Sequence, residues 1–560
     1  MCKSFLLFLS LTLVAGAQTA IKTMVAAPPD PRPSSAAFAA LETISPERIR
    51  AHVRFLANDL LEGRGTGQRG GDIAAEYIAT QFAVYGLKPV GDNGTYMQKV
   101  PMVGISPAPG TTFSLVPTSG APITLRVLDD YVAYDQTQQP QSDIDAPIVF
   151  VGYGIHAPEY NWDDYKDTDL KGKVLLMLVN EPTSGDDPKF FKGKALTYYG
   201  RWTYKYEEAA RRGAVGAILI HQTEMASYPW EVVRNSNSGE KSYLKLDGTP
   251  KLKAASWIQF SVAQKLAAAS GQDLSKIMAS ALSRDFKPVP LSVKLQAHIV
   301  SKIRSFASNN VIGVLPGTDA KLRDEAVLYT AHYDHLGIRS EMPGDNIYNG
   351  ANDNATGCGV LLELARAFGQ VSQKPRRSII FASVTAEEQG LLGSEYLGKH
   401  PPIPAGKITL DLNYDDLPPL GSPEEVEVSG AERTNFYRTV EATAKDFRLT
   451  IRPDSHPEAG YYYRSDHFSL ARVGIPSFSV NEGVKYKGHD EAWGLAQDEE
   501  YNKKHYHQPS DEYHPDMDFT GDGTMARFGF VLGWQAAMQP RLIGWEKGDE
   551  FEAARVKGGD

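Results

Sequence analysis

The hydrophobic positions of this chain follow two periods. Near the N-terminus, apolar side chains recur every three or four residues, as at Ile49, Val53 and Leu56, which is the period of an amphipathic helix. That pattern begins after Ser45-Pro46-Glu47, a combination typical of a helix start. A Gly-rich break, EGRGTGQRGG, separates it from a second helical pattern, DIAAEYIATQFAVYGL. The N-terminal part of the fold is therefore predicted to be helical.

Farther along the chain, short and continuous apolar runs predict buried strands. The runs AVLYTA, SIIFASVT and KITLDLN begin at residues 326, 378 and 407, and helical patterns separate them. This alternation indicates an α/β fold, for which we expect a mixed, mostly parallel sheet sandwiched by helices. Between these regions, from about Asp145 onward, shorter strands are punctuated by Pro and Gly, which indicates an inserted β-rich module.

These patterns predict the following organisation of the chain. We expect a signal peptide at 1–20, a flexible Pro/Ala/Ser-rich lead-in at 21–44, a main domain made of 45–129 and 296–550, and an inserted module at 130–295. The signal peptide is predicted because Lys3 precedes an apolar stretch, Phe5–Val14, and the small residues Ala15-Gly16-Ala17 follow. The expected localisation is therefore periplasmic or secreted.

Charge and composition argue against a nucleic-acid-binding protein and against a membrane span after the N-terminal segment. The net charge is −10 and no long basic block occurs, which argues against nucleic acid as a partner. After the N-terminal segment no stretch approaches the roughly 20 apolar residues that a membrane span needs. The two cysteines are Cys2 and Cys358, so removal of the signal peptide would leave no pair for a disulfide. The oligomeric state is left open.

Imidazole and carboxylate groups follow the predicted strands. His332 and Asp334 follow the first strand in an H-x-D arrangement, in which a carboxylate can orient a metal-bound imidazole. Asp353 lies among small residues in GANDNATG, where two cations can approach it, although a helix N-cap is an equal alternative. Glu387 and Glu388 follow another buried strand, so one can bind metal while the other accepts a proton from water.

Two further candidates have rivals nearby. Asp415 ends the strand-like run KITLDLNYD, and Asp411 and Asp416 are alternatives to it. His507 lies in the polar segment HYHQPSDEYH, too hydrophilic for a core, and its spacing does not exclude His505 or His514. The neighbouring Tyr506 is a possible donor to a developing oxyanion.

Together these residues form a donor set of imidazole and carboxylate groups without a useful thiol. Such a set suits zinc in a catalytic site rather than a structural one. Two metals that share one carboxylate would activate a water between them and polarise a scissile carbonyl. Affinity alone does not choose zinc over cobalt or manganese.

The order of these motifs closely resembles the family of co-catalytic zinc aminopeptidases and glutamate carboxypeptidases. The family pattern of H-x-D, G-x-x-D-N, E-E, N-x-D and a late H is matched here by His332/Asp334, Asp353, Glu387-Glu388, Asp415 and His507. The resemblance implies two Zn²⁺ per chain, one held by His332, Asp353 and Asp415 and the other by Asp353, Glu388 and His507.

The resemblance also implies roles, a fold and an activity. Glu387 would be the general base and Tyr506 would stabilise the transition state, while Asp334 would support the catalytic site. The bond Asp353–Asn354 would be cis, and the zinc aminopeptidase fold would carry an inserted protease-associated domain. The segment VGYGIHAPEYNWDDYKDTDLKGKVLLMLVN resembles such a domain.

The function expected from this resemblance is that of a zinc-dependent exopeptidase acting on peptides, above all an aminopeptidase. Glutamate-carboxypeptidase-like or dipeptidase activity is the alternative, and the side-chain preference is open. A glutaminyl cyclase, normally with one metal and no inserted domain, is a further alternative. A receptor-like relative without catalysis would have lost the ligands, which are intact here.

Overall fold

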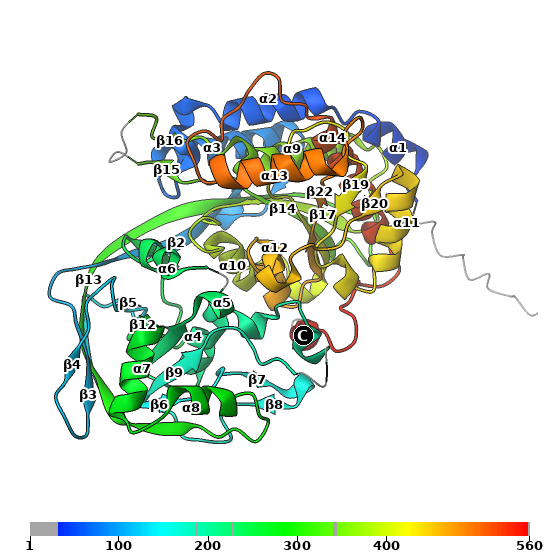
Figure 1. Cartoon of the computed structure of the whole chain (residues 1–560). Coiled ribbons are helices and arrows are strands. Elements are labelled where there is room, and N and C mark those ends of the chain that lie inside the picture. Colours follow the sequence, from blue (N-terminus) through cyan, green and yellow to red (C-terminus); the bar gives the residue numbers. More distant parts are fainter. Residues whose placement is uncertain (1–31, 185–186, 188, 227, 340–343, 558–560) are drawn as a thin grey trace, which may run out of the picture. The chain divides into compact units, whose positions relative to one another are not determined.

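The computed structural model describes residues 32–184, 187, 189–226, 228–339 and 344–557 (Figure 1). The predicted signal peptide lies outside these residues. Four strands form a parallel sheet in the order β21-β18-β14-β17, with bounds Ser477–Ser479, Ile408–Asn413, Ala326–His332 and Ser378–Val384. Two strands extend it in antiparallel fashion: β13 (Val289–Leu315) beside β17, and β2 (Met97–Pro107) beside β13.

Helices cover both faces of this sheet. Four helices pack on one face of the sheet, against the apolar side chains of alternate strand positions. They are α2 (Pro46–Leu56), α3 (Arg69–Val84), α9 (Gly357–Gln370) and α14 (Thr520–Met538). The helices α10 (Leu392–Lys399) and α12 (His467–Arg472) pack on the other face. Successive side chains of β14 point to opposite faces of the sheet. Tyr329 is buried on the face covered by α2, α3, α9 and α14, and Leu328 is buried on the face covered by α10 and α12. The predicted α/β fold with a mostly parallel sheet between helices is confirmed.

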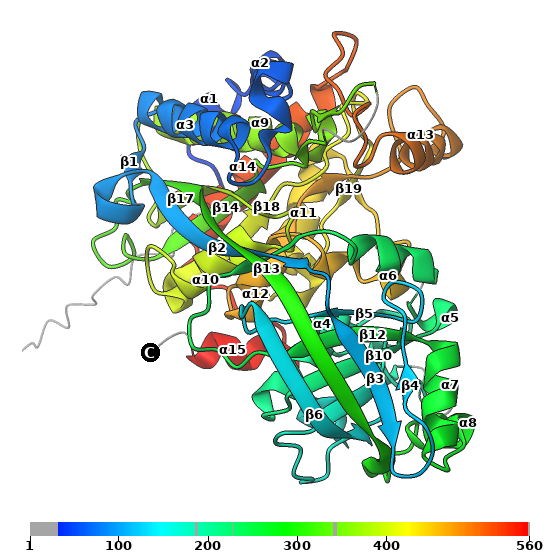
Figure 2. The same ribbon diagram turned by 90° about the vertical axis from the view of Figure 1, so that its left-hand side faces the viewer.

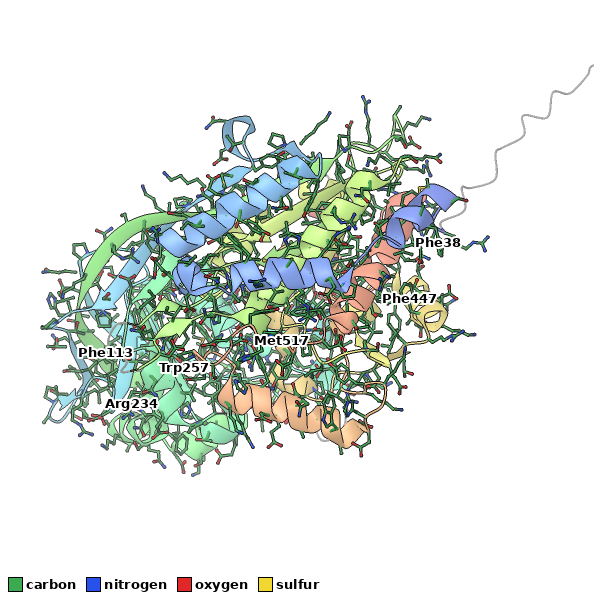
Figure 3. The ribbon with its side chains drawn as sticks, turned by 90° about the horizontal axis from the view of Figure 1, so that it is seen from above. Phe38, Phe113, Arg234, Trp257, Phe447 and Met517 are labelled. Atoms are coloured by element: carbon green, nitrogen blue, oxygen red, sulfur yellow. The ribbon has the colours of Figure 1, made fainter. Side chains whose placement is uncertain are left out.

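The predicted flexible lead-in, 21–44, ends earlier than expected. Residues Ser35–Leu41 form helix α1, in which the Ser34 hydroxyl accepts a hydrogen bond from the backbone N–H of Ala37. Ala37 and Leu41 are buried in the main core, whereas Phe38 points outward and is 54% exposed (Figure 3). The Ala-rich composition that suggested a linker is equally that of a helix, because Ala has the highest helix propensity.

The region predicted as an inserted module, 130–295, carries strands that extend the same sheet beyond β13. The long strand β13 continues into it and pairs there with β3 (Thr112–Pro117) and β6 (Gln141–Phe150) (Figure 2). From β6 the sheet continues with three parallel strands, β9 (Val174–Leu178), β10 (Gly216–His221) and β12 (Ala254–Gln259). Helices α4 (Trp202–Arg211) and α7 (Phe260–Ala269) belong to the same region.

The parallel strands β14, β17 and β18 end at one edge of the main sheet. The segments that follow them carry His332 and Asp334, Glu387 and Glu388, and Asp415. Strand ends of an open α/β sheet are where sites are built. Helix α11 (Tyr437–Phe447) packs against α14, and α13 (Glu491–Lys504) precedes the segment that carries His507. Within the described residues, no helix has both the length and the apolar character required to cross a membrane.

Candidate metal centre

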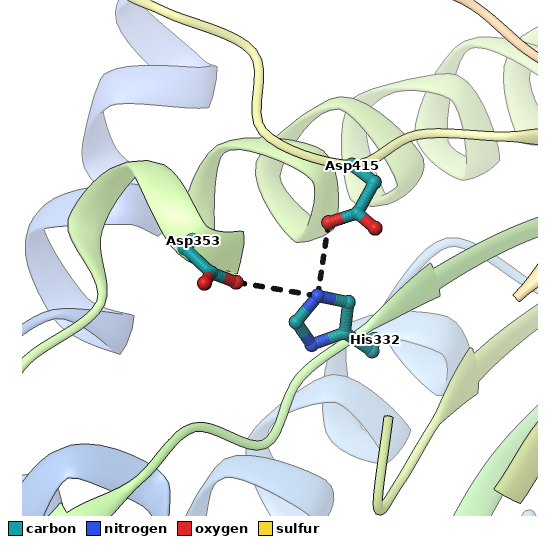
Figure 4. Close-up of side chains that lie close together, drawn as sticks. All are labelled: His332, Asp353 and Asp415. Carbon is teal, nitrogen blue, oxygen red and sulfur yellow. Dashed lines mark hydrogen bonds and ion pairs between the residues drawn. The ribbon is translucent and has the colours of Figure 1, made fainter. Parts of the chain in front are cut away.

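The first group of candidate ligands consists of His332, Asp353 and Asp415 (Figure 4). The Nε2 atom of His332 lies 2.9 Å from Oδ1 of Asp415 and 3.4 Å from Oδ1 of Asp353. Ser465 donates its hydroxyl to the other oxygen of Asp415, Oδ2, at 2.5 Å. Three segments that are far apart in sequence thus place one imidazole and two carboxylates around one point.

The second group lies on the other side of Asp353. The Nε2 atom of His507 is 3.2 Å from Oδ2 of Asp353 and 3.0 Å from Oε2 of Glu388. His335 approaches the same carboxylates through Nδ1, at 2.5 Å from Oε1 of Glu388 and 3.8 Å from Oδ2 of Asp353. The group therefore contains two imidazoles, of which the sequence analysis named only His507.

Asp353 is placed between the two groups by its loop. Its Oδ1 faces His332 while its Oδ2 faces His507 and His335. The Asp353–Asn354 peptide bond is cis, as the resemblance implied. The Asp511 carboxylate accepts the backbone N–H groups of Asn352 and Asp353, at 2.9 and 3.1 Å, and so fixes the loop from the His507 side.

The spacing of the donor atoms fits zinc. Zn–N and Zn–O bonds of about 2.0–2.1 Å in a tetrahedral site place neighbouring ligand atoms roughly 3.3 Å apart. The separations that involve His332 are 2.9 and 3.4 Å, and those that involve His507 are 3.0 and 3.2 Å. The pair His335 Nδ1 and Glu388 Oε1, at 2.5 Å, is too close for two ligands of one tetrahedral ion and is instead a hydrogen bond.

The tautomer of His335 supports that assignment. Its ring is buried, and its Nε2 has no hydrogen-bond partner among the described residues. A proton on Nε2 would leave a donor unsatisfied and would aim the lone pair of Nδ1 at a carboxylate. His335 therefore donates from Nδ1 to Glu388, and the opposite oxygen of Glu388 stays directed at His507. Gly350 leaves room for this ring, since a Cβ there would lie 2.7 Å from it.

The electrostatics of the centre call for additional positive charge. Burial alone would lower the pKa of His332, but Asp415 and Glu387 raise it well above its usual value. Burial also favours a lower pKa at His507, but the hydrogen bonds of His507 to Asp353 and Glu388 raise its pKa to about 10. Both shifts arise from the negative charge of the surrounding carboxylates, which divalent cations bound at the same positions would compensate.

Glu387 and Asp334 lie beside the ligands without joining them. The backbone N–H of Glu387 donates to Oδ1 of Asp334 at 3.1 Å, and the Thr66 hydroxyl donates to Oδ2 at 2.6 Å. The closest atom of Asp334 to Nδ1 of His332 is its backbone oxygen, at 3.1 Å, whereas its carboxylate is 3.9 Å away. Burial raises the pKa of Glu387 well above its usual range, and His332 opposes that change.

The rivals to the candidate residues lie outside both groups. Asp411 is hydrogen-bonded to the Thr330 hydroxyl at 3.0 Å, within β18, and Asp416 is contacted by Tyr501. His505 contacts Ser510, and His514 is exposed. The ring of Tyr506 stacks on His507 with centroids 3.9 Å apart, and its side chain is 40% exposed. Among the alternatives left open by the sequence, the geometry favours Asp415 and His507.

A buried arginine ties the N-terminal segment to the centre. Arg64 lies in the Gly-rich break and is fully buried. Its guanidinium donates to four backbone oxygens, those of Tyr333, Leu56, Asn349 and Gly350, at 2.7, 2.7, 2.5 and 2.8 Å. Its own backbone oxygen accepts the N–H of His335 at 3.2 Å. Arg64 therefore connects the loop that carries His332 and His335 with the loop that leads to Asp353.

The sequence contained no usable signal for the residues that support the ligands. His335 stands beside the H-x-D motif and Arg64 stands in EGRGTG, but neither spacing indicated a partner. Ser465 and Asp511 reach the centre from loops whose course no local pattern predicts.

Comparisons with known proteins match this part of the chain. Residues 310–528, which include every candidate ligand, match Peptidase family M28. Aminopeptidase NAALADL1 of Mus musculus is 36% identical over 172 residues, 27% of this chain and 21% of that protein. Leupeptin-inactivating enzyme 1 of Streptomyces exfoliatus is 29% identical over 173 residues, 30% of this chain and 38% of that protein. The similarity thus spans less than half of these relatives.

Among solved structures, one similar chain is the aminopeptidase from Aneurinibacillus sp. strain AM-1. It is 18% identical, with a TM-score of 0.46, and the alignment covers 89% of this chain and 95% of that one.

Proposed function

We propose that the protein is a di-zinc exopeptidase that removes N-terminal residues from peptides, on the premise that residues 310–528 match Peptidase family M28. The observation that carries this proposal is the position of Asp353, whose two carboxylate oxygens face separate groups of ligands. One shared carboxylate between two groups of ligands is the arrangement expected of a two-metal hydrolase.

The residues have distinct tasks in this proposal. His332, Asp353 and Asp415 would hold one zinc ion, and Asp353, Glu388 and His507 the other. The two ions, when bound, lower the pKa of a water and polarise the scissile carbonyl. Asp511, Ser465 and His335 hold the ligands in place through the hydrogen bonds described above.

Glu387 is the general base of the proposed reaction. Its carboxylate makes no hydrogen bond to a protein group among the described residues, while its backbone is fixed by Asp334. It takes a proton from the attacking water and delivers it to the leaving amine. Tyr506 lies beside His507 and is assigned to stabilise the developing oxyanion, in line with the family resemblance.

The test is hydrolysis of aminoacyl chromogenic amides and N-blocked peptides, with metal analysis of the same samples. Cleavage of substrates with a free N-terminus only, with about two zinc ions per chain, would support the aminopeptidase assignment. Cleavage of N-blocked peptides would replace it by carboxypeptidase activity. Bound metal without hydrolysis would leave a cyclase or a receptor-like protein.

Two further proposals concern the whole chain. The module that we expect at 130–295 is proposed to be a protease-associated domain that contacts the substrate. The protein is proposed to be exported after removal of residues 1–20, which the mass of the mature N-terminal peptide would test.

A further inference from the structure

A buried carboxyl group, that of Asp411, lies on β18 and takes no part in either group of ligands. Its side chain is fully buried, and its Oδ2 atom has no hydrogen-bond partner among the described residues. Its Oδ1 atom lies 3.0 Å from Oγ1 of Thr330, on the neighbouring strand β14. The hydroxyl of Ser477, on the strand at the other side, donates to the backbone oxygen of Ile475 instead. Burial raises the pKa of Asp411 well above its usual value, and the charge of Asp466 adds to that shift.

A chain of hydrogen bonds joins Asp411 to the proposed metal ligand Asp415. Oγ1 of Thr330 lies 2.9 Å from Oδ1 of Asn413, and Nδ2 of Asn413 lies 2.8 Å from Oγ of Ser465. Oγ of Ser465 is 2.5 Å from Oδ2 of Asp415, whose other oxygen faces the imidazole of the same group (Figure 4). Thr330 and Asn413 are fully buried, so solvent does not compete for these bonds.

The direction of each bond follows from the ligand end of the chain. A carboxylate that binds metal carries no proton, so the hydroxyl of Ser465 donates to Asp415. Because a hydroxyl has one proton, Ser465 accepts from Asn413, which turns Nδ2 toward Ser465 and Oδ1 toward Thr330. The single hydroxyl proton of Thr330 is then used for Asn413. The remaining bond, between Thr330 and Asp411, needs a proton from Asp411.

An ionised Asp411 would break this order. It would take the hydroxyl proton of Thr330, and Oδ1 of Asn413 would lose its donor. A buried acceptor would then be unsatisfied and a buried charge would be unpaired, and both are costly. A neutral Asp411 removes both costs.

We propose that Asp411 is held as a neutral carboxylic acid that positions the ligand Asp415 through three other side chains. The proton of Asp411 orients Thr330, Thr330 orients the amide of Asn413, and that amide leaves the proton of Ser465 for Asp415. Asp411 acts through other residues and is therefore a positioning residue rather than a catalytic one. The inference rests on the proposed function and deepens it, because it identifies what controls one of the proposed zinc ligands.

The first experiment measures the protonation of Asp411 directly. Infrared spectra of the full-length protein and of Asp411→Asn are recorded at neutral pH, and their difference isolates Asp411 because other buried acids contribute equally to both. The difference should show the loss of a C=O stretching band of a carboxylic acid. Loss of a carboxylate band instead would overturn the proposal.

The second experiment interrupts the chain and measures zinc affinity by competition with a chelator. Thr330→Val and Asp411→Leu each remove the proton that holds Oδ1 of Asn413 in place. The amide can then turn over and take the proton of Ser465 away from Asp415. The affinity of one zinc ion should fall by about 10-fold, the lower end of the loss typical when a group that orients a ligand is removed. Asp411→Asn keeps a neutral donor of the same shape and should retain the affinity.

The matched control is Thr409→Val. Thr409 is a fully buried residue of β18, and its hydroxyl accepts the backbone N–H of Ile543 at 2.9 Å, outside the chain from Asp411 to Asp415. The variant loses a buried hydrogen bond, so its stability should fall while both zinc affinities stay unchanged. An equal loss of zinc affinity in Thr409→Val and Thr330→Val would overturn the positioning role. So would unchanged affinity in Thr330→Val and Asp411→Leu.

These measurements separate the inference from the proposed function. The infrared difference requires neither zinc nor turnover, and chelator competition requires no peptide. A carboxylic acid band at Asp411 and selective loss of one zinc ion, in a protein that cleaves no peptide, would sink the proposed function alone. Peptide hydrolysis with an ionised Asp411 would sink this inference alone.

Discussion

Oδ1 of Asp334 accepts the backbone N–H of Glu387 at 3.1 Å, although the two residues follow different strands. The bond connects the segment after β14 to the segment after β17, and Thr66 holds the other oxygen of Asp334 from a third segment. Because the carboxylate is 3.9 Å from His332, its direct effect is on the position of Glu387. The acid of the H-x-D motif thereby aligns the proposed base with the ligands.

Replacing Glu387 by Gln should separate catalysis from metal binding. Glu387 makes no ligand contact, so Glu387→Gln should keep about two zinc ions per chain. Loss of a general base typically costs roughly 10²–10⁴-fold in rate, and kcat should fall by that factor. Steady-state kinetics and metal analysis of one preparation measure both effects.

The paired variant is Asp353→Ala. Asp353 belongs to both groups of ligands, so its loss should lower the zinc content at both positions. Equal zinc loss in Glu387→Gln and Asp353→Ala would contradict the division of roles between base and ligand.

His335→Phe should weaken one metal position and spare the other. The variant removes the donor that holds Oε1 of Glu388 and leaves the group around His332 intact. Loss of a partner that orients a ligand typically costs about 10- to 100-fold in metal affinity. Competition between the protein and a chelator should therefore show one weakened and one unchanged zinc ion.

Two controls define what the His335 result means. His505→Phe alters an imidazole that contacts Ser510 outside the centre, and should leave both affinities unchanged. His507→Phe removes a proposed ligand and should cost more than His335→Phe. If the two losses were equal, His335 would be a ligand itself rather than the donor that orients Glu388.

The sequence offers candidates where a strand ends and, in Asp353 and His507, within polar loops, but it gives no sign of the residues that support them. His332, Glu388 and Asp415 were identified because an apolar run ends just before each, and the run marks a strand end. The choice of Asp415 over Asp411 depended on which residue lies beyond the last strand position, and β18 ends at Asn413. Arg64, Ser465 and Asp511 were missed because their partners are backbone or side-chain atoms of segments far away in sequence.

Arg64→Met should destabilise the fold and both metal positions together. The change removes four hydrogen bonds from buried backbone oxygens, and each buried group left unsatisfied costs about 1–3 kcal/mol. The free energy of unfolding should fall by about 3 kcal/mol or more, and zinc should be released at lower chelator concentration. Lys presents its three donors from one nitrogen and cannot reach all four oxygens. Arg64→Lys should therefore lose nearly as much stability and zinc affinity as Arg64→Met.

The control for this variant is Arg69→Met. The side chain of Arg69 is 71% exposed and pairs with Glu62 at the surface, so stability should change by less than about 0.5 kcal/mol. Retention of full zinc affinity in a folded Arg64→Met protein would show that Arg64 supports the core without positioning the ligand loops.

The N-terminal helices should make stability depend on pH through His52. Its Nδ1 lies 2.8 Å from the Tyr77 hydroxyl, and burial, with the charge of Arg366, lowers its pKa from 6.5 to about 4. Between these values the unfolded chain binds a proton that the folded chain excludes. Stability should therefore fall as pH drops from 6.5 to 4, by about 3 kcal/mol in full. Urea unfolding of the zinc-free protein measures this change. Between pH 6.5 and 4 the free energy of unfolding should fall less for His52→Gln than for the unmodified chain, whereas His456→Gln, at an exposed position, should behave like the unmodified chain. An unchanged slope in His52→Gln would mean that other groups cause the acid sensitivity.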